Sequence, residues 1–324
     1  MSKKVIVSVL FAMLAAALAG RAAPAPQRPA VADLRSFGAT GDGRADDSAA
    51  FRAAIAQAEK ASVPIYVPAG RYLLRGRFLL HVPVYGDWSR SSILLLRGPD
   101  SGLIVGESEQ VYIRDLAVEG DGSKNQVGIM VGDKGRQADF CYMQRLEVRR
   151  CGSHGIWLRK GNCCTIRDVR SFGNYGCGLL LDAIPGDDPN GGYCTNSHQI
   201  HAYLVGNSMS GLKIGHSGSN VIDVTAEGNG AMYDEKSPGG WGLEIDSAQR
   251  LITCYTEGNG TDLFRPEGAK RHKGGIWCKP DCYGAIINCW SWEGVGRNPG
   301  RTPLIENHNN LAIWGQTQRV PWQP

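Results

Sequence analysis

Side chains suited to acid–base chemistry stand at fixed places beside a repeated Gly-Asn pair. The pair marks a repeated turn at Gly173-Asn174, Gly206-Asn207, Gly228-Asn229 and Gly258-Asn259. Glu227 and Glu257 directly precede two of these pairs. Two carboxylates at equivalent places suit an acid–base pair, or an oxygen-rich Ca²⁺ site that also includes Asp223. The alternative is a ladder of solvated glutamates whose repulsion is screened by basic neighbours.

A second group consists of Arg170, His201 and Tyr203. Elimination from a uronate needs a cation for the carboxylate, a base for the C5 proton and an acid for the leaving oxygen. Arg170, His201 and Tyr203 could fill these roles in that order. The alternative is a capped histidine and an amphipathic surface tyrosine.

A repeat in the chain predicts the elements that carry these side chains. The pattern Gly-apolar-any-apolar begins at Gly128, Gly155, Gly178, Gly211, Gly242 and Gly275. Before most of these glycines lie a second strand and a Gly-Asn turn, and glycine tolerates the positive φ that such a turn needs. Two linked motifs that stay in step over successive repeats predict the coils of a parallel β-solenoid.

Alternation along the strands predicts which side chains face the core. The inward set is Ile200, Ala202, Leu204, Ile222, Val224, Ala226, Ile252, Cys254, Thr256, Ile287, Cys289 and Ser291. The outward columns are Asp168-His201-Asp223-Thr253, Arg170-Tyr203-Thr225-Tyr255-Trp290 and Phe172-Val205-Glu227-Glu257-Trp292. Cys254 and Cys289 then lie in one inward column, which we interpret as a ladder of small apolar side chains rather than a disulfide.

The strand after each Gly-Asn turn predicts a rival groove. Its outward column reads Met130, Trp157, Leu180, Lys213, Glu244 and Trp277. Aromatic rings can stack on the apolar faces of sugars, so the predicted substrate-binding residues are Trp157, Lys213, Glu244, Tyr255, Trp277 and Trp290. Insertions over 231–240, 260–273 and roughly 296–303 interrupt one turn on successive coils, and long loops of this kind often carry function.

The N-terminus reads as an export signal. Lys3 and Lys4 precede an apolar run from Val5 to Ala19, and Ala17-Leu18-Ala19 is typical of a cleavage site. We therefore expect a signal peptide over 1–19, a flexible lead-in over 20–30 and a secreted or periplasmic protein. A retained helical anchor is the alternative. The net charge of +4 is too small to indicate a nucleic-acid partner.

Residues 31–72 carry a family resemblance. Phe37-Gly38-Ala39, Gly41-Asp42-Gly43 and Asp46-Asp47 precede a helical pattern, which is followed by Val67-Pro68-Ala69-Gly70-Arg71-Tyr72. This segment resembles the opening of the pectate-lyase-like, or tailspike-like, family. The resemblance implies an all-β fold, a right-handed single-stranded parallel β-helix with an N-terminal capping helix, as one domain over 31–324. It makes Asp46 and Asp47 cap and turn residues rather than catalysts.

The same resemblance implies a carbohydrate-active protein. Our first expectation is a polysaccharide lyase that cleaves an acidic, uronate-containing glycan, with C5 epimerisation as a variant that shares proton abstraction. A glycoside hydrolase of the polygalacturonase-like type, acting through Glu227 and Glu257, is an alternative, and a non-catalytic glycan-binding surface protein is another. We expect no nucleic-acid partner, no membrane span in the mature form, and a monomer or small homo-oligomer.

Overall fold

The computed structural model describes residues 31–182, 195–215, 219–230, 240–246, 249–259, 274–278, 284–287, 289–292, 305–306 and 311–314. The predicted signal peptide, the lead-in and the loops over 183–194, 231–239, 260–273 and 296–303 lie outside these residues. In the described part, no helix combines the length and the apolar character needed to cross a membrane. The extents of the signal peptide and of a single domain over 31–324 stay predictions.

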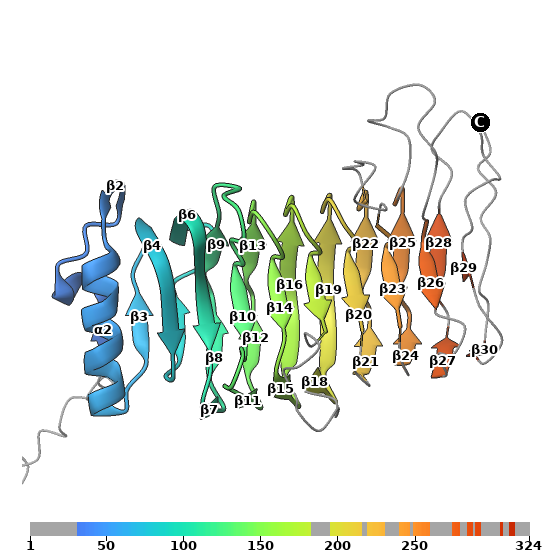
Figure 1. The fold of residues 1–324 in the computed structure, drawn as a ribbon, viewed down its shortest axis with the longest axis horizontal. Helices are drawn as coiled ribbons and strands as arrows, with labels where there is room; N and C mark the ends of the chain where they lie inside the picture. Colours follow the sequence, from blue (N-terminus) through green and yellow to red (C-terminus); the bar gives the residue numbers. More distant parts are fainter. Residues whose placement is uncertain are drawn as a thin grey trace, which may run out of the picture. The chain divides into compact units, whose positions relative to one another are not determined.

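Within residues 32–324 the chain winds into successive coils of parallel strands (Figure 1). Each coil contributes to three ladders, called A, B and C here, in which every strand pairs with its counterparts one coil before and after. Two strands serve ladders A and B together, β4 (Gly70–Leu80) and β6 (Ser92–Val105), and two serve ladders A and C, β16 (Thr165–Phe172) and β19 (Gln199–Val205). The predicted parallel β-helix is confirmed.

The remaining strands belong to single ladders. Ladder A contains β9 (Ala117–Glu119), β13 (Glu147–Arg149), β22 (Thr225–Glu227), β25 (Tyr255–Glu257) and β28 (Trp290–Trp292). Ladder B contains β10 (Ile129–Val131), β14 (Ile156–Leu158), β17 (Leu179–Leu181), β20 (Leu212–Ile214), β23 (Leu243–Ile245), β26 (Ile276–Cys278) and β29 (Ile305–Glu306). Ladder C contains β1 (Ala32–Asp33), β3 (Ile65–Val67), β5 (Val84–Gly86), β8 (Tyr112–Arg114), β12 (Tyr142–Gln144), β21 (Ser219–Ile222), β24 (Gln249–Ile252), β27 (Gly284–Ile287) and β30 (Leu311–Trp314).

Short elements complete the coils. β2 (Asp42–Asp46) pairs with β4 near the N-terminal end. Two small two-stranded sheets lie at a corner and consist of β7 (Ser108–Glu109) with β11 (Ala138–Asp139), and β15 (Gly161–Asn162) with β18 (Thr195–Asn196). The 3₁₀ helix η1 (Leu34–Phe37) and the helix α2 (Ser48–Ala61) precede β3.

Helix α2 covers the first coils with one apolar face. Phe51, Ala54 and Ala58 are completely buried and belong to the same core cluster as the strands. Asp47 precedes the helix, and its carboxylate accepts hydrogen bonds from the backbone N–H groups of Thr40, at 2.7 Å, and Gly41, at 3.2 Å. Asp47 is therefore a turn residue, as the resemblance implied.

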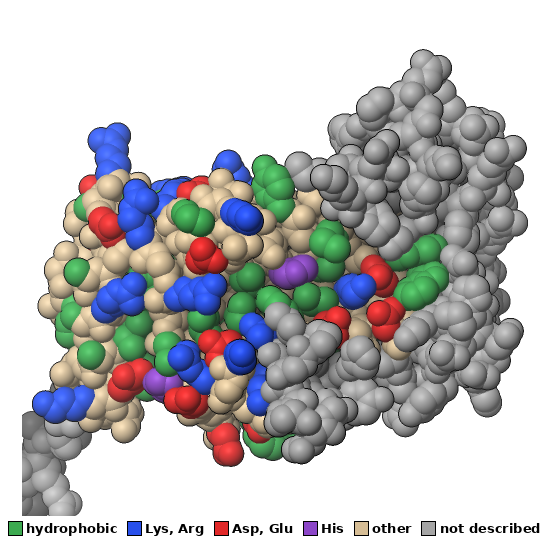
Figure 2. Space-filling view, in the orientation of Figure 1, with side chains coloured by type: hydrophobic (Ala, Val, Ile, Leu, Met, Phe, Trp, Pro, Cys, Tyr) green, Lys and Arg blue, Asp and Glu red, His purple; other side chains and the backbone are tan. Residues whose placement is uncertain are grey.

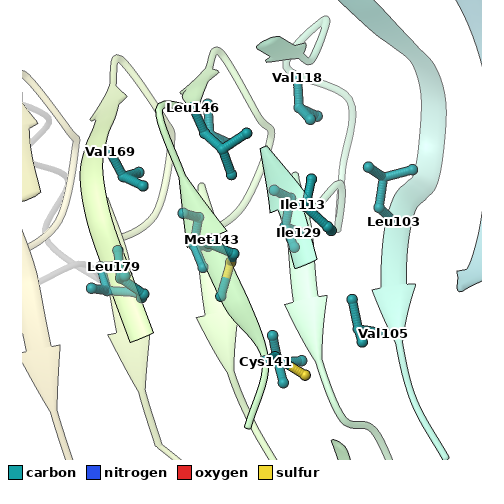
Figure 3. Close-up of a cluster of buried hydrophobic side chains, with 14 of the residues drawn as sticks. Leu103, Val105, Ile113, Val118, Ile129, Cys141, Met143, Leu146, Val169 and Leu179 are labelled. Carbon is teal, nitrogen blue, oxygen red and sulfur yellow. The ribbon is translucent and has the colours of Figure 1, made fainter. Parts of the chain in front are cut away.

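The core runs along the inside of the coils. Figure 3 shows side chains from successive coils, including Ile113, Met143 and Val169, directed into this interior. The predicted inward residues Ile200, Ala202 and Leu204 are at most 4% exposed, and Cys254 and Cys289 are fully buried. The side chains of Ile252, Ile287 and Ser291 lie outside the described set.

One inward prediction is wrong. Ile222 is 40% exposed, and Val221 fills the core instead. The cause is Asp223, which has a φ of 53° and inserts one extra residue at the bend between ladders C and A. Counting back through this residue shifts the alternation by one, so the side chains before it change faces.

The corner between ladders A and B explains why two sequence motifs stay in step. The buried amides of Asn174, Asn207, Asn229 and Asn259 are joined from coil to coil by Nδ2–Oδ1 hydrogen bonds of 2.9 Å. A Cβ on Gly178 would lie 2.7 Å from the Asn207 amide nitrogen. The motif glycines that leave room for the asparagine of the following coil in this way are Gly155, Gly178, Gly211 and Gly242.

Candidate functional site

The outer face of ladder A carries the predicted acid–base residues. Arg170, Tyr203, Thr225, Tyr255 and Trp290 are register partners, as are Phe172, Val205, Glu227, Glu257 and Trp292. Both predicted columns are confirmed, although the side chains of the two tryptophans lie outside the described set. Since paired strands lie about 4.8 Å apart, neighbours in a column are within contact distance.

Arg170, Tyr203 and Glu227 come together on this face. The Tyr203 hydroxyl donates to Glu227 Oε2 at 2.6 Å, and the Arg170 guanidinium lies 5.7 Å from the centre of the Tyr203 ring. The hydrogen bond to Glu227 is the main cause that raises the pKa of Tyr203. Tyr203 is therefore a protonated donor at neutral pH. On the following coil, the Tyr255 hydroxyl donates to Glu257 Oε2 at 2.8 Å.

His201 and Asp223 occupy the bend rather than the ladder. His201 Nδ1 lies 3.3 Å from Asp168 Oδ1 and accepts the Asp168 backbone N–H, also at 3.3 Å. Asp223 accepts a hydrogen bond from the Thr253 hydroxyl. The described residues contain no group of three or more His, Cys, Asp or Glu side chains that could hold an ion, and the possible Ca²⁺ site of Asp223, Glu227 and Glu257 stays a prediction. The catalytic roles stay predictions.

The sequence reading missed an ion-pair network on the same face. Glu119 and Glu147 are each 7% exposed, and Arg149 donates to Glu119 at 2.9 Å and to Glu147 at 2.7 Å. Glu147 Oε1 also lies 3.6 Å from Arg170. The 23-residue coil would have located this network, because Glu147 stands one coil before Arg170. These coils lack the Gly-Asn pair from which the columns were counted.

The outer face of ladder B is an apolar strip. The register partners along this face are Ile104, Met130, Trp157, Leu180, Lys213, Glu244 and Trp277. The column predicted for the strand after each Gly-Asn turn is confirmed. Met130 and Leu180 point outward yet are only 9% and 7% exposed. The Trp157 indole is held by a 2.8 Å hydrogen bond from Nε1 to the Asp182 carbonyl. At one end of the strip, Ile104 and Met130 line a small open pocket together with Arg77.

The strip ends in a buried ion pair. Lys213 Nζ lies 2.7 Å from Glu244 Oε1 and 4.0 Å from Asp246 Oδ2, and the Ser210 hydroxyl donates to Glu244 Oε2. Burial opposes the charge of Lys213, but the attraction of Glu244 outweighs it, so the pKa of Lys213 is raised. Lys213 is therefore a fixed cation, a quarter exposed at the strip.

Two tryptophans adjoin this ion pair. The rings of Trp241 and Trp277 stack with centres 6.4 Å apart and planes 21° apart. Trp241 is buried, and its backbone N–H donates to the Ser210 hydroxyl at 3.0 Å. The same serine thus links the aromatic pair to Glu244, while Trp277 stays half exposed beside the cation.

His154 stands in the Gly-Ser-His-Gly segment directly before β14. Its Nδ1 accepts the Cys177 backbone N–H at 3.0 Å, and its ring meets the edge of Trp157 at 5.5 Å between centres. Burial, and then the charge of Lys213, lower the pKa of His154 to about 4. The imidazole is therefore neutral at pH 7, and because Nδ1 accepts, its proton is on Nε2.

These features make the ladder B face the stronger candidate site. An apolar surface with a few convergent polar groups and a shifted pKa is the usual mark of a binding or catalytic site. Figure 2 shows one face of the molecule on which hydrophobic side chains gather between basic and acidic ones, with a histidine among them. Of the predicted binding residues, Trp157, Lys213, Glu244 and Trp277 share this face, whereas Tyr255 and Trp290 belong to ladder A.

Comparison with known proteins agrees with the fold. Residues 31–97 match the family model described as rhamnogalacturonase A/epimerase, pectate lyase-like. A curated relative, the mannuronan C5-epimerase AlgE2 of Azotobacter vinelandii, is 27% identical over 246 residues, which are 62% of this chain and 24% of the relative. The chain thus spans about a quarter of that relative's length.

Solved structures with the same fold have low sequence identity. ORF18 of Geobacillus virus E2 is 15% identical, with a TM-score of 0.58 over 88% of this chain and 62% of the other. The catalytic domain of Agl-KA is 13% identical, with a TM-score of 0.50 over 90% of this chain and 69% of the other. The chain therefore has the parallel β-helix fold of these structures, and residues 31–97 are similar to the pectate-lyase-like family.

Proposed function

We propose that the protein is a carbohydrate-active enzyme that removes the C5 proton of a uronate in an acidic polysaccharide bound along ladder B. The observation that carries the proposal is the strip that leads from Met130 and Trp157 to the Lys213–Glu244 pair, beside the neutral His154. The apolar strip suits the apolar faces of sugar rings, and the cation suits a carboxylate.

The chemistry follows from the charges. Lys213 binds the uronate carboxylate and stabilises the enolate that forms when the C5 proton leaves. The neutral His154 adds an Nε2–H donor without repelling the cation, which is the arrangement that a neutral electrophilic imidazole requires. Glu244 and Asp246 lie 2.7 and 4.0 Å from the Lys213 ammonium, and one of these carboxylates accepts the proton.

The same enolate leads to two products. Return of a proton to the opposite face of C5 gives epimerisation. Cleavage of the C4–O4 bond, with O4 leaving as the protonated hydroxyl of the neighbouring sugar, gives β-elimination. The similarity to a mannuronan C5-epimerase supports epimerisation, while the lyase activity expected from the sequence stays a prediction. Export through residues 1–19, also a prediction, would bring the enzyme to extracellular glycans.

The test is incubation of the purified protein with mannuronan and polygalacturonate in deuterated water. Deuterium at C5 with intact chains means epimerisation, and exchange with ultraviolet absorbance of a C4–C5 double bond means elimination. Glu244→Gln and Asp246→Asn identify the proton acceptor, with Glu109→Gln, on a strand of a separate small sheet, as the control. Absence of both signals from every polymer would reject the proposal.

One observation favours hydrolysis as a second candidate. Glu227 and Glu257 are register partners on adjacent strands, so their backbones lie about 4.8 Å apart, close to the spacing of about 5 Å between the carboxyl groups of a retaining glycosidase. New reducing ends without a double bond, abolished in Glu227→Gln and Glu257→Gln, would support this candidate. Lys213→Gln would then leave turnover unchanged.

A further inference from the structure

The ladder A face has a cluster of arginines that the proposed reaction does not use. Arg149 is the inner member, with its guanidinium hydrogen-bonded to Glu119 and to Glu147. Around it lie three more exposed guanidiniums within ion-pair distance of the same two carboxylates. These three residues, Arg71, Arg150 and Arg170, are called the arginine surface below.

The charges of this cluster do not balance. Four guanidiniums share the two carboxylates of Glu119 and Glu147, which leaves two positive charges in excess. At the edge of the cluster, Arg97 and Asp121 carry opposite charges and cancel in this count. The Asp121 carboxylate is held by the backbone N–H groups of Gly98 and Ser123.

The excess lies on the outer residues. Arg149 is 20% exposed, whereas Arg71 and Arg170 are 48% exposed and Arg150 is 67% exposed. Their nearest carboxylate oxygens are 3.7, 3.6 and 3.8 Å away, beyond hydrogen-bonding distance. The donors of the arginine surface therefore stay directed to solvent, although the near-buried glutamates fix where each guanidinium lies.

The spacing fits an extended anion. Arg71 and Arg170 are separated by four strand steps in one column, or about 19 Å at about 4.8 Å a step. Arg150 lies between them, directly after β13. Beneath them, Ile93, Leu95 and Ala117 are at most 6% exposed, so the guanidinium stems rest on a closed apolar layer.

We propose that the arginine surface is a second binding site, which holds the carboxylates of a long acidic polysaccharide away from the ladder B strip. Guanidinium groups bind carboxylates in a two-pronged geometry and keep their charge at every physiological pH. A ligand that contacts all three arginines must carry carboxylates over a length of about 19 Å, so the site selects long chains. The choice of a polysaccharide as the ligand rests on the proposed function.

The binding test uses affinity electrophoresis in gels that contain mannuronan. The variant is Arg71→Gln/Arg150→Gln, and the matched control is Lys60→Gln/Lys134→Gln, which removes the same charge from exposed residues on helix α2 and after β10. We expect the variant to bind about five- to tenfold more weakly and to lose much of the salt dependence, because each lost contact is a surface ion pair. The control should match the wild type.

Three results would overturn the proposal. Equal retention of the variant and the wild type would show that the arginines do not bind the polymer. Equal weakening in the control would reduce the effect to net charge. Tighter, Arg71- and Arg150-dependent binding of duplex DNA than of mannuronan would make this a nucleic-acid surface.

A second measurement separates this inference from the proposed function. On short uronate oligomers the variant should turn over as the wild type does, and on long mannuronan its KM should rise with kcat unchanged. Lys213→Gln should lose turnover on both yet keep Arg71- and Arg150-dependent retention. If wild type shows no turnover while retention still depends on these arginines, the proposed function fails and the binding site stands.

Discussion

Ladders A and B share the same coils and the same core, yet their outer faces are built in opposite ways. Ladder A presents a charged surface, on which the exposed Arg71, Arg150 and Arg170 surround the nearly buried carboxylates of Glu119 and Glu147. Ladder B presents apolar side chains and withdraws its main ion pair, Lys213–Glu244, from solvent. A partly buried charge acts far more strongly on a ligand than a charge exposed to water. The ladder B face is therefore the better candidate for catalysis.

The sharpest test of this contrast compares the two cations. Lys213→Gln should lower C5 exchange by about 100-fold or more, since it removes the charge that stabilises the enolate. Arg170→Gln, on ladder A, should change exchange on short oligomers far less. Steady-state kinetics on oligomers with thermal unfolding as the folding control would measure both. A larger loss in the Arg170 variant would move the active site to ladder A.

The corner between the ladders is expected to govern stability. Asn207→Ala would remove the side-chain hydrogen bonds to the Asn174 amide, the Ser171 carbonyl and the Asn229 amide oxygen, which would keep only the backbone N–H of residue 207. Losing buried hydrogen bonds of this kind should cost about 2–4 kcal/mol. Chemical denaturation would measure the loss, with the solvent-facing Thr225→Ala of ladder A as the control, which should cost well under about 1 kcal/mol.

A pH prediction follows from His154 on ladder B. Its folded pKa of about 4 lies below the ordinary value of 6.5, so the unfolded chain binds more protons between these values. Stability should therefore fall as the pH drops from 6.5 towards 4, by up to about 3 kcal/mol from this group alone. His154→Asn should flatten the dependence of the unfolding temperature on pH in this window, whereas His201→Asn, at the exposed bend, should not.

The smallest expected effect concerns the bend that leads into ladder A. Val221→Ala should cost about 2 kcal/mol, because it opens the core, whereas Ile222→Ala should cost well under about 1 kcal/mol. Urea denaturation of the two variants would decide this. The reverse order would mean that the alternation is not shifted by Asp223.

The coils, two outward columns on ladder A and the column on ladder B could be derived from the sequence, because strand alternation and the Gly-Asn turn are local signals. The outward orientation of Ile222 could not be derived, because the extra residue at Asp223 depends on a left-handed φ that the presence of an aspartate does not predict. The Glu119–Arg149–Glu147 network was equally hidden. Its coils end without the Gly-Asn pair, and pairing across coils is a tertiary property.

The candidate site was harder to derive than the fold. Residue type and register position predicted Arg170, Tyr203 and Glu227 as candidate catalytic residues, and the structure brings these three together. The sequence could not show that the His154 imidazole is neutral, because its pKa depends on burial and on Lys213 from another coil. Candidate residues were predicted on both faces, because the difference in solvent exposure between the faces is visible only in the folded chain.

The asparagine stack has a further consequence for how such a protein can grow. The coils that carry Asn174, Asn207, Asn229 and Asn259 are bonded to one another by the same contact at the corner, so a duplicated coil among them would find both of its neighbours already complementary. A half coil would find neither. The strip on ladder B can therefore lengthen only in whole steps of about 4.8 Å, one coil at a time.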